Sequence, residues 1–216
     1  MSRVLQQPLG VILAGGLATR MGGGDKGLLE IGGAPLLQRV IDRLEPQVAG
    51  VALNANGDAD RFAGYGLPVL RDSIAGFPGP LAGVLAGLDW AAEQGADSIV
   101  TVAADTPFFP CDLVPHLLLA AEDAPHPLAL ACTPRSGEEA LKSGGGKRLN
   151  RHPTFGLWPV ALADDLRAAL GEGLRKVVLW TDRHSAGEAL FPAEPFDPFF
   201  NVNTPEDLAR ARELAS

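Results

Sequence analysis

The first half of this 216-residue chain alternates short apolar runs with segments whose apolar residues have helical spacing. The apolar runs predict strands at residues 11–13, 51–53, 67–70 and 98–103. The last run, SIVTVA, is almost uninterrupted, which is typical of a parallel sheet with helices on both faces. Helical spacing lies between the runs, at residues 36–44 and 81–92. This alternation predicts a three-layer α/β domain with a mostly parallel sheet and right-handed crossovers.

The second half is less regular. We expect helices at residues 113–121, 162–170 and 174–181, and strands at 128–132 and 154–160, one of them antiparallel. Thr204, Pro205 and Asp207 match the start of a capped final helix. Because no repeat or linker is evident, we expect a single domain over residues 1–216.

Composition narrows the function classes. Hydrophobic residues make up 46% and charged residues 20%, as in ordinary globular proteins. A net charge of -8 argues against nucleic acid or an anionic membrane surface as partner, because the long-range field has the wrong sign. Cys111 and Cys132 lack metal-ligand spacing and suit a reducing compartment. No secretory signal or membrane-spanning run is present, so we expect a cytoplasmic location.

A glycine-rich stretch, VILAGGLATRMGGGDK, covers residues 11–26. It places Leu13, Ala14 and Gly15 at a strand end, followed by the cations Arg20 and Lys26. Backbone amides and positive charge at such a position favour a phosphate ligand. The spacing matches neither the Walker motif nor the dinucleotide fingerprint. A flexible surface loop that happens to hold cations is the alternative interpretation.

Polar residues follow the other predicted strands of this half. Asn54, Asp72 and Asp105 each come at or just after a strand end, as Gly15 does. Ligands of such sheets bind beyond the carboxyl ends of the strands. The Asp105 carboxylate could hold Mg²⁺, which prefers oxygen ligands and commonly links carboxylates to nucleotide phosphates. Turn or cap roles remain alternatives for all three polar residues.

The motifs, taken in order, resemble the nucleotidyltransferases that build activated sugars and cofactors, and within them the molybdenum cofactor guanylyltransferases. The matching segments are LAGG at 13–16, RMG at 20–22, Lys26, PGPLAG at 78–83, DTP at 105–107, HPT at 152–154 and NVNTP at 201–205. The resemblance covers almost the whole chain and implies a Rossmann-like nucleotidyltransferase domain. It further implies transfer of GMP from GTP to molybdopterin or its molybdenum-carrying form, with Mg²⁺ and release of pyrophosphate.

By this resemblance, Asp105 is the metal ligand and the nucleotide contacts are Leu13, Ala14, Gly15, Lys26, Asn54, Asp72 and Asp105. Arg20 and Lys26 can neutralise charge on the α-phosphate and on departing pyrophosphate. The Asp72 carboxylate could accept hydrogen bonds from guanine N1–H and the exocyclic amine, which cytosine and uracil cannot offer.

The second substrate is less well defined. Asn203 lies where relatives place a metal or phosphate contact, and Asn201 could face the pterin, although both could be strand-end caps. His152 has no neighbouring carboxylate or cysteine and suits a positioning or structural role better than a general base. A basic glycine-rich segment, residues 135–151, reads as a mobile loop, either a lid over the pterin phosphate or a solvated loop.

Other functions stay open at this point. A cytidylyltransferase or sugar-phosphate nucleotidyltransferase of the same fold is the nearest rival. A nucleotide-sensing or chaperone-like module that has lost catalysis is the rival from another class, and a dehydrogenase is disfavoured by the glycine spacing. Transient contact with a cofactor-delivery or recipient protein is a further expectation of the resemblance.

Overall fold

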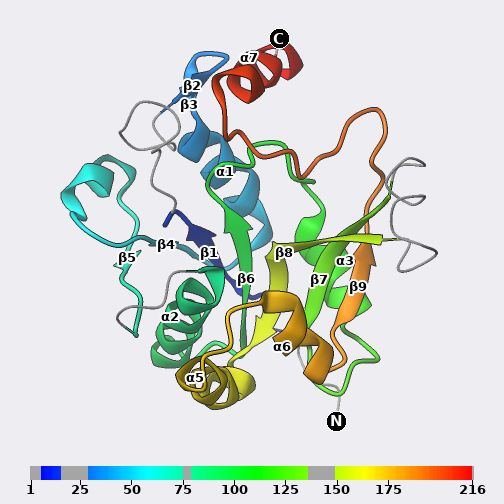
Figure 1. Cartoon of the computed structure of the whole chain (residues 1–216). Helices are drawn as coiled ribbons and strands as arrows, with labels where there is room; N and C mark the ends of the chain where they lie inside the picture. Colours follow the sequence, from blue (N-terminus) through cyan, green and yellow to red (C-terminus); the bar gives the residue numbers. More distant parts are fainter. Residues whose placement is uncertain (1–5, 16–28, 75–78, 136–148, 216) are drawn as a thin grey trace.

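The computed structural model describes residues 6–15, 29–74, 79–135 and 149–215. Its main strands are β1 (Leu9–Leu13), β4 (Val51–Asn54), β5 (Val69–Leu70), β6 (Ser98–Ala103), β7 (Ala129–Pro134), β8 (Leu149–Pro159) and β9 (Gly187–Leu190). They form one sheet in the order β5-β4-β1-β6-β8-β7-β9, with helices on both faces (Figure 1). Neighbours pair in parallel except β8, which runs antiparallel to β6 and β7. The expected mostly parallel α/β fold with an antiparallel strand in the second half is confirmed.

Helices and short turns connect these strands. The helices are α1 (Leu36–Leu44), α2 (Pro80–Glu93), α3 (Leu113–Ala120), α5 (Ala163–Gly171), α6 (Val177–Arg183) and α7 (Pro205–Leu214). Short 3-10 turns are η3 (Glu45–Gln47), η4 (Asp60–Tyr65) and η5 (Val160–Leu162), and β2 (Glu30–Ile31) pairs with β3 (Ala34–Pro35) in a separate hairpin. None of the helices in the described ranges is long and apolar enough to cross a bilayer.

Alternating side chains of the strands build a core on each face of the sheet. On β1, Ile12 packs in a cluster with α1 and α3, whereas Val11 packs in a second cluster with α2, α5 and α6. Both residues are fully buried. Successive side chains of a strand point to opposite faces, so two apolar layers need strands without polar positions. This is the physical reason for the apolar runs in the sequence.

The strand order contains a switch point. From β1 the chain moves outward through β4 to β5, and then returns to the other side of β1 as β6. After β1 the chain continues toward β5, and after β6 it continues toward β9, although α1 and α3 pack on the same face of the sheet. The carboxyl ends of β1 and β6 flank the crevice where α/β folds bind ligands. Leu13 of β1 is level with Asn54 of β4 and Ala103 of β6, so the three strands end together.

Two expectations for the second half were wrong in detail. Strand β8 begins at Leu149 rather than near residue 154, so Arg151 belongs to a strand and not to a basic loop. Its guanidinium forms ion pairs with Asp182 of α6 and Glu188 of β9, which explains why a charged residue is accommodated there. The edge strand β9 was not expected at all, because its four residues, GEAL, carry little apolar pattern.

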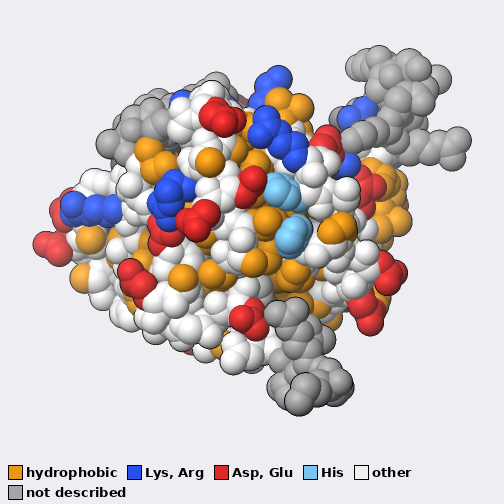
Figure 2. Space-filling view, turned by 90° about the horizontal axis from the view of Figure 1, so that it is seen from below, with side chains coloured by type: hydrophobic (Ala, Val, Ile, Leu, Met, Phe, Trp, Pro, Cys, Tyr) orange, Lys and Arg blue, Asp and Glu red, His pale blue; other side chains and the backbone are white. Residues whose placement is uncertain are grey.

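The end of the molecule opposite the strand carboxyl ends is a separate polar surface. There the Asp165 carboxylate of α5 accepts hydrogen bonds from Trp180 Nε1 and His184 Nε2 of the α6 region, both at 2.8 Å. Burial alone would raise the pKa of Asp165, but these two donors and the positive charges of His184 and Arg183 together outweigh it and hold the pKa below its ordinary value. Figure 2 shows two imidazoles side by side on this face, with acidic and basic side chains interspersed. The two hydrogen bonds of Asp165 link α5 to α6.

Candidate nucleotide site

Those predicted nucleotide contacts that fall within the described residues lie at the carboxyl edge of the sheet. Gly15 follows β1, Asn54 ends β4, Asp72 follows β5 and Asp105 follows β6. The backbone ladder continues past the strands, since the Ala104 amide donates to the Leu13 carbonyl at 3.1 Å. Gly15 and Asp105 therefore both lie two positions beyond the paired residues of β1 and β6. The sequence-based expectation that these segments converge agrees with the strand register.

Ala14 and Gly15 offer different groups to a ligand. The Ala14 amide donates to the Asn54 carbonyl at 2.9 Å, so it belongs to the sheet and is not available to a phosphate. Gly15 is exposed, and a Cβ added to it would meet nothing within 4 Å in the described part of the chain. Of these two amides, that of Gly15 is the one left to bind an anion at the switch point.

Asp105 is held by the segment that precedes α7. The Val202 amide donates to the Asp105 carbonyl at 2.8 Å. The buried Thr106 hydroxyl lies 2.5 Å from Asn201 Oδ1 and 3.3 Å from Asp105 Oδ1, and it can donate its one proton to either oxygen at a time. The structure thus brings Asn201 beside Asp105.

Asn203 is fixed by the start of α7. Its amide donates to Asp207 Oδ2 at 2.9 Å, and the same oxygen accepts the Thr204 amide at 2.9 Å. The Thr204 hydroxyl accepts the Asp207 amide at 3.1 Å, which completes the expected capping box. The predicted residues Asn201 and Asn203 thereby flank Val202, whose amide is bound to Asp105.

The donor atoms at this edge suit a hard cation. Asp105 supplies a carboxylate and Asn201 an amide oxygen. Within the described ranges, no group of three His, Cys, Asp or Glu side chains could hold a metal. Mg²⁺ sites in nucleotide-binding proteins commonly use one or two carboxylates together with substrate phosphates. The residues present therefore fit Mg²⁺.

Asp72 is bound by two asparagines. Asn54 Nδ2 donates to Asp72 Oδ1 at 3.0 Å, and Asn56 Nδ2 donates to Asp72 Oδ2 at 2.8 Å. Asn54 is buried, with 5% of its surface exposed, whereas Asn56 is exposed. The sequence did not lead us to predict Asn56 as a site residue. Its spacing of two from Asn54 was the available signal, because alternate residues of an extended segment share a face.

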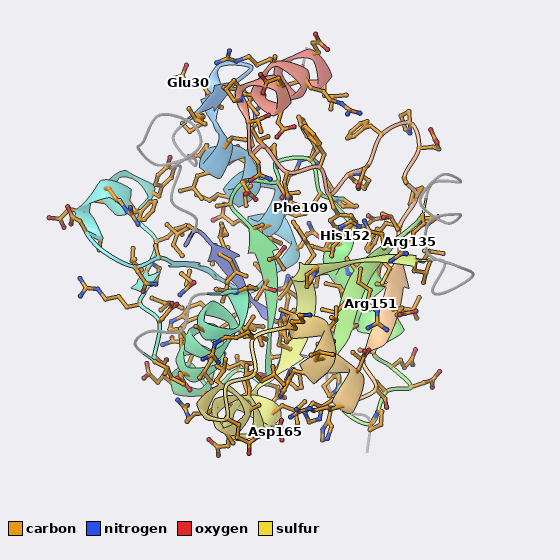
Figure 3. All side chains as sticks on the ribbon, viewed as in Figure 1. Glu30, Phe109, Arg135, Arg151, His152 and Asp165 are labelled. Carbon is orange, nitrogen blue, oxygen red and sulfur yellow. The ribbon has the colours of Figure 1, made fainter. Side chains whose placement is uncertain are left out.

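His152 packs beside the segment that reaches Asp105. Its ring stacks on Phe199 with centroids 4.2 Å apart, and its Nε2 lies 2.9 Å from the Thr133 hydroxyl. Burial lowers the pKa of His152, and the nearby Asp197 charge opposes that effect only partly. Figure 3 shows His152 on the outer part of β8, away from the ends of β1 and β4. These contacts agree with a positioning role.

Several predicted residues lie outside the described residues. They are Arg20 and Lys26 of the first glycine-rich stretch, and Lys142, Lys147 and Arg148 of the basic segment.

Fold and site together define the class of this chain. A parallel sheet with a glycine turn and an acidic residue at its switch point is the arrangement of an α/β domain that handles nucleotides. The family described as MobA-like NTP transferase domain matches residues 10–186. A molybdenum cofactor guanylyltransferase of Rhodopseudomonas palustris (strain BisB5) is 52% identical over 208 residues, 95% of this chain and 92% of that protein.

Further comparisons agree. A second such enzyme, from Bradyrhizobium sp. (strain ORS 278), is 50% identical and covers 96% of this chain and 92% of its own. The crystal structure of molybdopterin-guanine dinucleotide biosynthesis protein A from Archaeoglobus fulgidus matches the fold with a TM-score of 0.67 at 24% identity, over 95% of this chain and 97% of that one. This chain belongs to the molybdenum cofactor guanylyltransferases, a family of nucleotidyltransferase enzymes.

Proposed function

We propose that this chain transfers GMP from GTP to molybdopterin, or to its molybdenum-carrying form, and releases pyrophosphate. The observation that carries the proposal is the placement of Gly15, Asp72 and Asp105 along one carboxyl edge of the sheet in a chain of this family. In the reaction, an oxygen of the pterin's terminal phosphate forms a bond to the α-phosphorus of GTP. The bond from that phosphorus to the departing pyrophosphate breaks, so the products are the guanine dinucleotide cofactor and pyrophosphate.

The protein acts by alignment and charge neutralisation. The exposed amide of Gly15 binds a phosphate oxygen, and Arg20 and Lys26 neutralise charge on the α-phosphate and on the leaving pyrophosphate. Asp105 holds Mg²⁺, which when bound neutralises further phosphate charge. No basic side chain is required to deprotonate the nucleophile, because the attacking phosphate is already an anion. Holding both substrates in line supplies much of the rate.

The base is read at the end of β5. The Asp72 carboxylate accepts the guanine N1–H and the exocyclic amine, while Asn54 supports it from below. Cytosine and uracil lack this pair of donors, so on either base the Asp72 oxygens would lose their partners, at roughly 1 to 3 kcal/mol for each unsatisfied group. Leu13 and Ala14 form the floor on which the nucleotide lies.

The second substrate binds on the other side of Asp105. Asn201 and Asn203 lie on the segment that is bonded to Asp105, so they are the candidates to contact the pterin phosphate. We place the reaction in the cytoplasm, where a delivery or recipient protein collects the product by transient contact.

One assay tests this proposal. Purified protein, Mg²⁺ and molybdopterin are incubated with GTP, CTP, ATP or UTP in turn, and pyrophosphate and the dinucleotide product are measured. The proposal expects turnover with GTP at least tenfold above that with the other nucleotides. Preference for CTP would favour the cytidylyltransferase alternative, and a lack of pyrophosphate with every nucleotide would favour a binding module.

A further inference from the structure

Asn56 forms a two-point pairing with residue 72. Its Nδ2 donates to Asp72 Oδ2 at 2.8 Å, and its Oδ1 accepts the Asp72 backbone amide at 3.1 Å. One side-chain amide therefore binds both the carboxylate and the backbone of the same residue. A ring of this kind fixes the side-chain rotation of Asp72 relative to its own backbone, because neither end can move without breaking a hydrogen bond.

A second side-chain amide, that of Asn54, binds the other carboxylate oxygen of Asp72 from the protein interior. The buried Asn54 donates through Nδ2 to Asp72 Oδ1 at 3.0 Å and also to the Leu70 carbonyl at 3.3 Å. Helix α2 closes over it, since a Cβ on Gly83 would come within 2.2 Å of Asn54 Oδ1. Asn54 is thus enclosed and hydrogen-bonded, and the exposed Asn56 binds Asp72 from the solvent side.

The number of acceptor sites that remain on Asp72 matters for recognition. An ionised carboxylate offers about four lone-pair sites. Among the residues that the structure describes, Asn54 and Asn56 each use one, on different oxygens, which leaves each oxygen with one further site. Guanine presents two adjacent donors, N1–H and the exocyclic amine, on its Watson–Crick edge. A carboxylate held in a fixed orientation with one open site on each oxygen matches that pair of donors.

We propose that Asn56 is a positioning residue that sets base specificity by fixing the Asp72 carboxylate for guanine. The inference rests on the proposed guanine-reading role of Asp72 and extends it to a residue that need not touch the nucleotide. In the protein without GTP, Asn56 restricts the orientations that the Asp72 carboxylate can adopt. Loss of Asn56 therefore weakens binding of bases that use both oxygens more than binding of bases that use one.

Residues 71–74, which carry Asp72, are also bound to α2 by a contact that does not involve Asn56. The Ser73 hydroxyl donates to Asp89 Oδ2 of α2 at 2.7 Å, and Arg167 of α5 holds the other Asp89 oxygen at 2.6 Å. Asn56 itself is exposed. Replacing Asn56 should therefore leave Ser73 bound to α2 and the protein folded. Any change in nucleotide binding can then be attributed to the lost contact with Asp72.

The test compares binding of GTP and ITP, because hypoxanthine keeps N1–H but lacks the exocyclic amine. Calorimetry with Mg²⁺ measures both dissociation constants for the wild-type chain, Asn56→Ala, Asp72→Asn and the double variant. Asp58→Ala is the matched control: Asp58 accepts the Asp60 amide at 3.0 Å in the same turn, so its loss loosens the turn without removing a bond to Asp72. Thermal unfolding confirms that each variant is folded.

The wild-type chain and Asp58→Ala are expected to bind GTP more tightly than ITP. Asn56→Ala should weaken GTP binding about tenfold, the size expected for one hydrogen bond to a charged group, and reduce the GTP-to-ITP ratio. In the Asp72→Asn background, Asn56→Ala should change the ratio no further. If Asp72→Asn abolishes the preference while Asn56→Ala leaves it intact, this inference is overturned and the proposed function stands. Equal binding of GTP and ITP by the wild-type chain overturns this inference and the guanine-reading role of Asp72, whereas the proposed GMP transfer is overturned only if turnover with GTP does not exceed that with CTP, ATP and UTP.

Discussion

The backbone amide of Val202 donates to the backbone carbonyl of Asp105 at 2.8 Å. This bond joins the last connecting segment of the chain to the end of the central strand β6. Asn201 and Asn203 are thereby fixed on either side of an acidic residue that the sequence places far from them. The two halves of the chain meet at this bond, and the proposed nucleotide and pterin sites lie on its two sides.

Asp105 should be essential for turnover. Replacing it with Ala removes the carboxylate that holds Mg²⁺ and should lower the rate constant with GTP by at least about a thousandfold. Pyrophosphate release at saturating Mg²⁺ measures the effect. The fold should persist, because the backbone carbonyl that accepts from Val202 remains. Asp112→Ala, an exposed carboxylate beyond the same strand, is the control and should keep full activity. Residual turnover near the wild-type level in Asp105→Ala would remove the residue from its role.

Gly83 should be required for nucleotide binding. An added methyl would lie 2.2 Å from Asn54 Oδ1, so Gly83→Ala forces that buried amide to move and releases its bond to Asp72. GTP affinity should fall about tenfold, measured by calorimetry.

Gly87, one turn further along α2, provides the matched control. A methyl there would meet Ile99 Cδ1 and Val11 Cγ2, both at 2.8 Å, so the strain falls on core aliphatic groups. Gly87→Ala should keep the GTP affinity of the wild-type chain. Equal loss of affinity in both variants would mean that distortion of the helix, and not Asn54, causes the effect.

Arg151 should contribute to stability through its two ion pairs. It is 17% exposed and bridges Asp182 and Glu188, which are themselves 45% and 37% exposed. Solvent screening of these partners limits the gain, and Arg151→Ala should lower the free energy of unfolding by about 1 kcal/mol. Urea unfolding measures this change.

Arg167→Ala serves as the comparison for Arg151. Arg167 is 43% exposed and pairs with Asp89, so Arg167→Ala should lower the free energy of unfolding by about 0.5 kcal/mol at most. If Arg167→Ala destabilised the fold more than Arg151→Ala, residues 149–151 would not be the well-fixed strand that β8 indicates.

His152 should make stability depend on pH in the acid range. Burial lowers its pKa in the folded state below the ordinary value of 6.5, against partial opposition from Asp197. Between those two values the unfolded chain binds the proton more readily. The contribution of His152 is therefore complete above pH 6.5 and is lost as the pH falls from 6.5 through the folded pKa.

The variant His152→Phe tests that dependence. Phenylalanine can keep the stack on Phe199 but cannot titrate, so the free energy of unfolding should fall less steeply as the pH drops below 6.5 than in the wild-type chain. NMR titration of the imidazole signal that disappears in the variant gives the folded pKa directly. A titration midpoint above 6.5 would contradict a pKa that burial lowers in the folded state.

The sequence predicted the fold best where one physical signal dominates. Residues 98–103 form β6 as expected, because a strand between two apolar layers needs an apolar side chain at nearly every position. The capped start of α7 was equally predictable, since a capping box is a local pattern. Strand β9 has only four residues and pairs with β7 through backbone atoms, so its composition carries little signal.

The candidate site was predicted in outline and not in its contacts. The strand ends at Gly15, Asn54 and Asp105 could be expected, because strand position follows from the apolar runs. The pairing of Asp72 with Asn54 and Asn56 could not be, since it depends on the register of β4 and β5 and on the close approach of α2. Likewise, nothing local to Asn201 indicates that its segment bonds to Asp105.

The most direct test of the account is a crystal structure with Mg²⁺ and a GTP analogue whose α,β-bridging oxygen is replaced by a methylene group. In this structure the Mg²⁺ ion is expected about 2.0 to 2.1 Å from an Asp105 carboxylate oxygen, as octahedral magnesium requires. The guanine N1–H and the exocyclic amine are expected to face the two oxygens of Asp72. A nucleotide bound away from the ends of β1 and β6, or a metal ion held without Asp105, would contradict it.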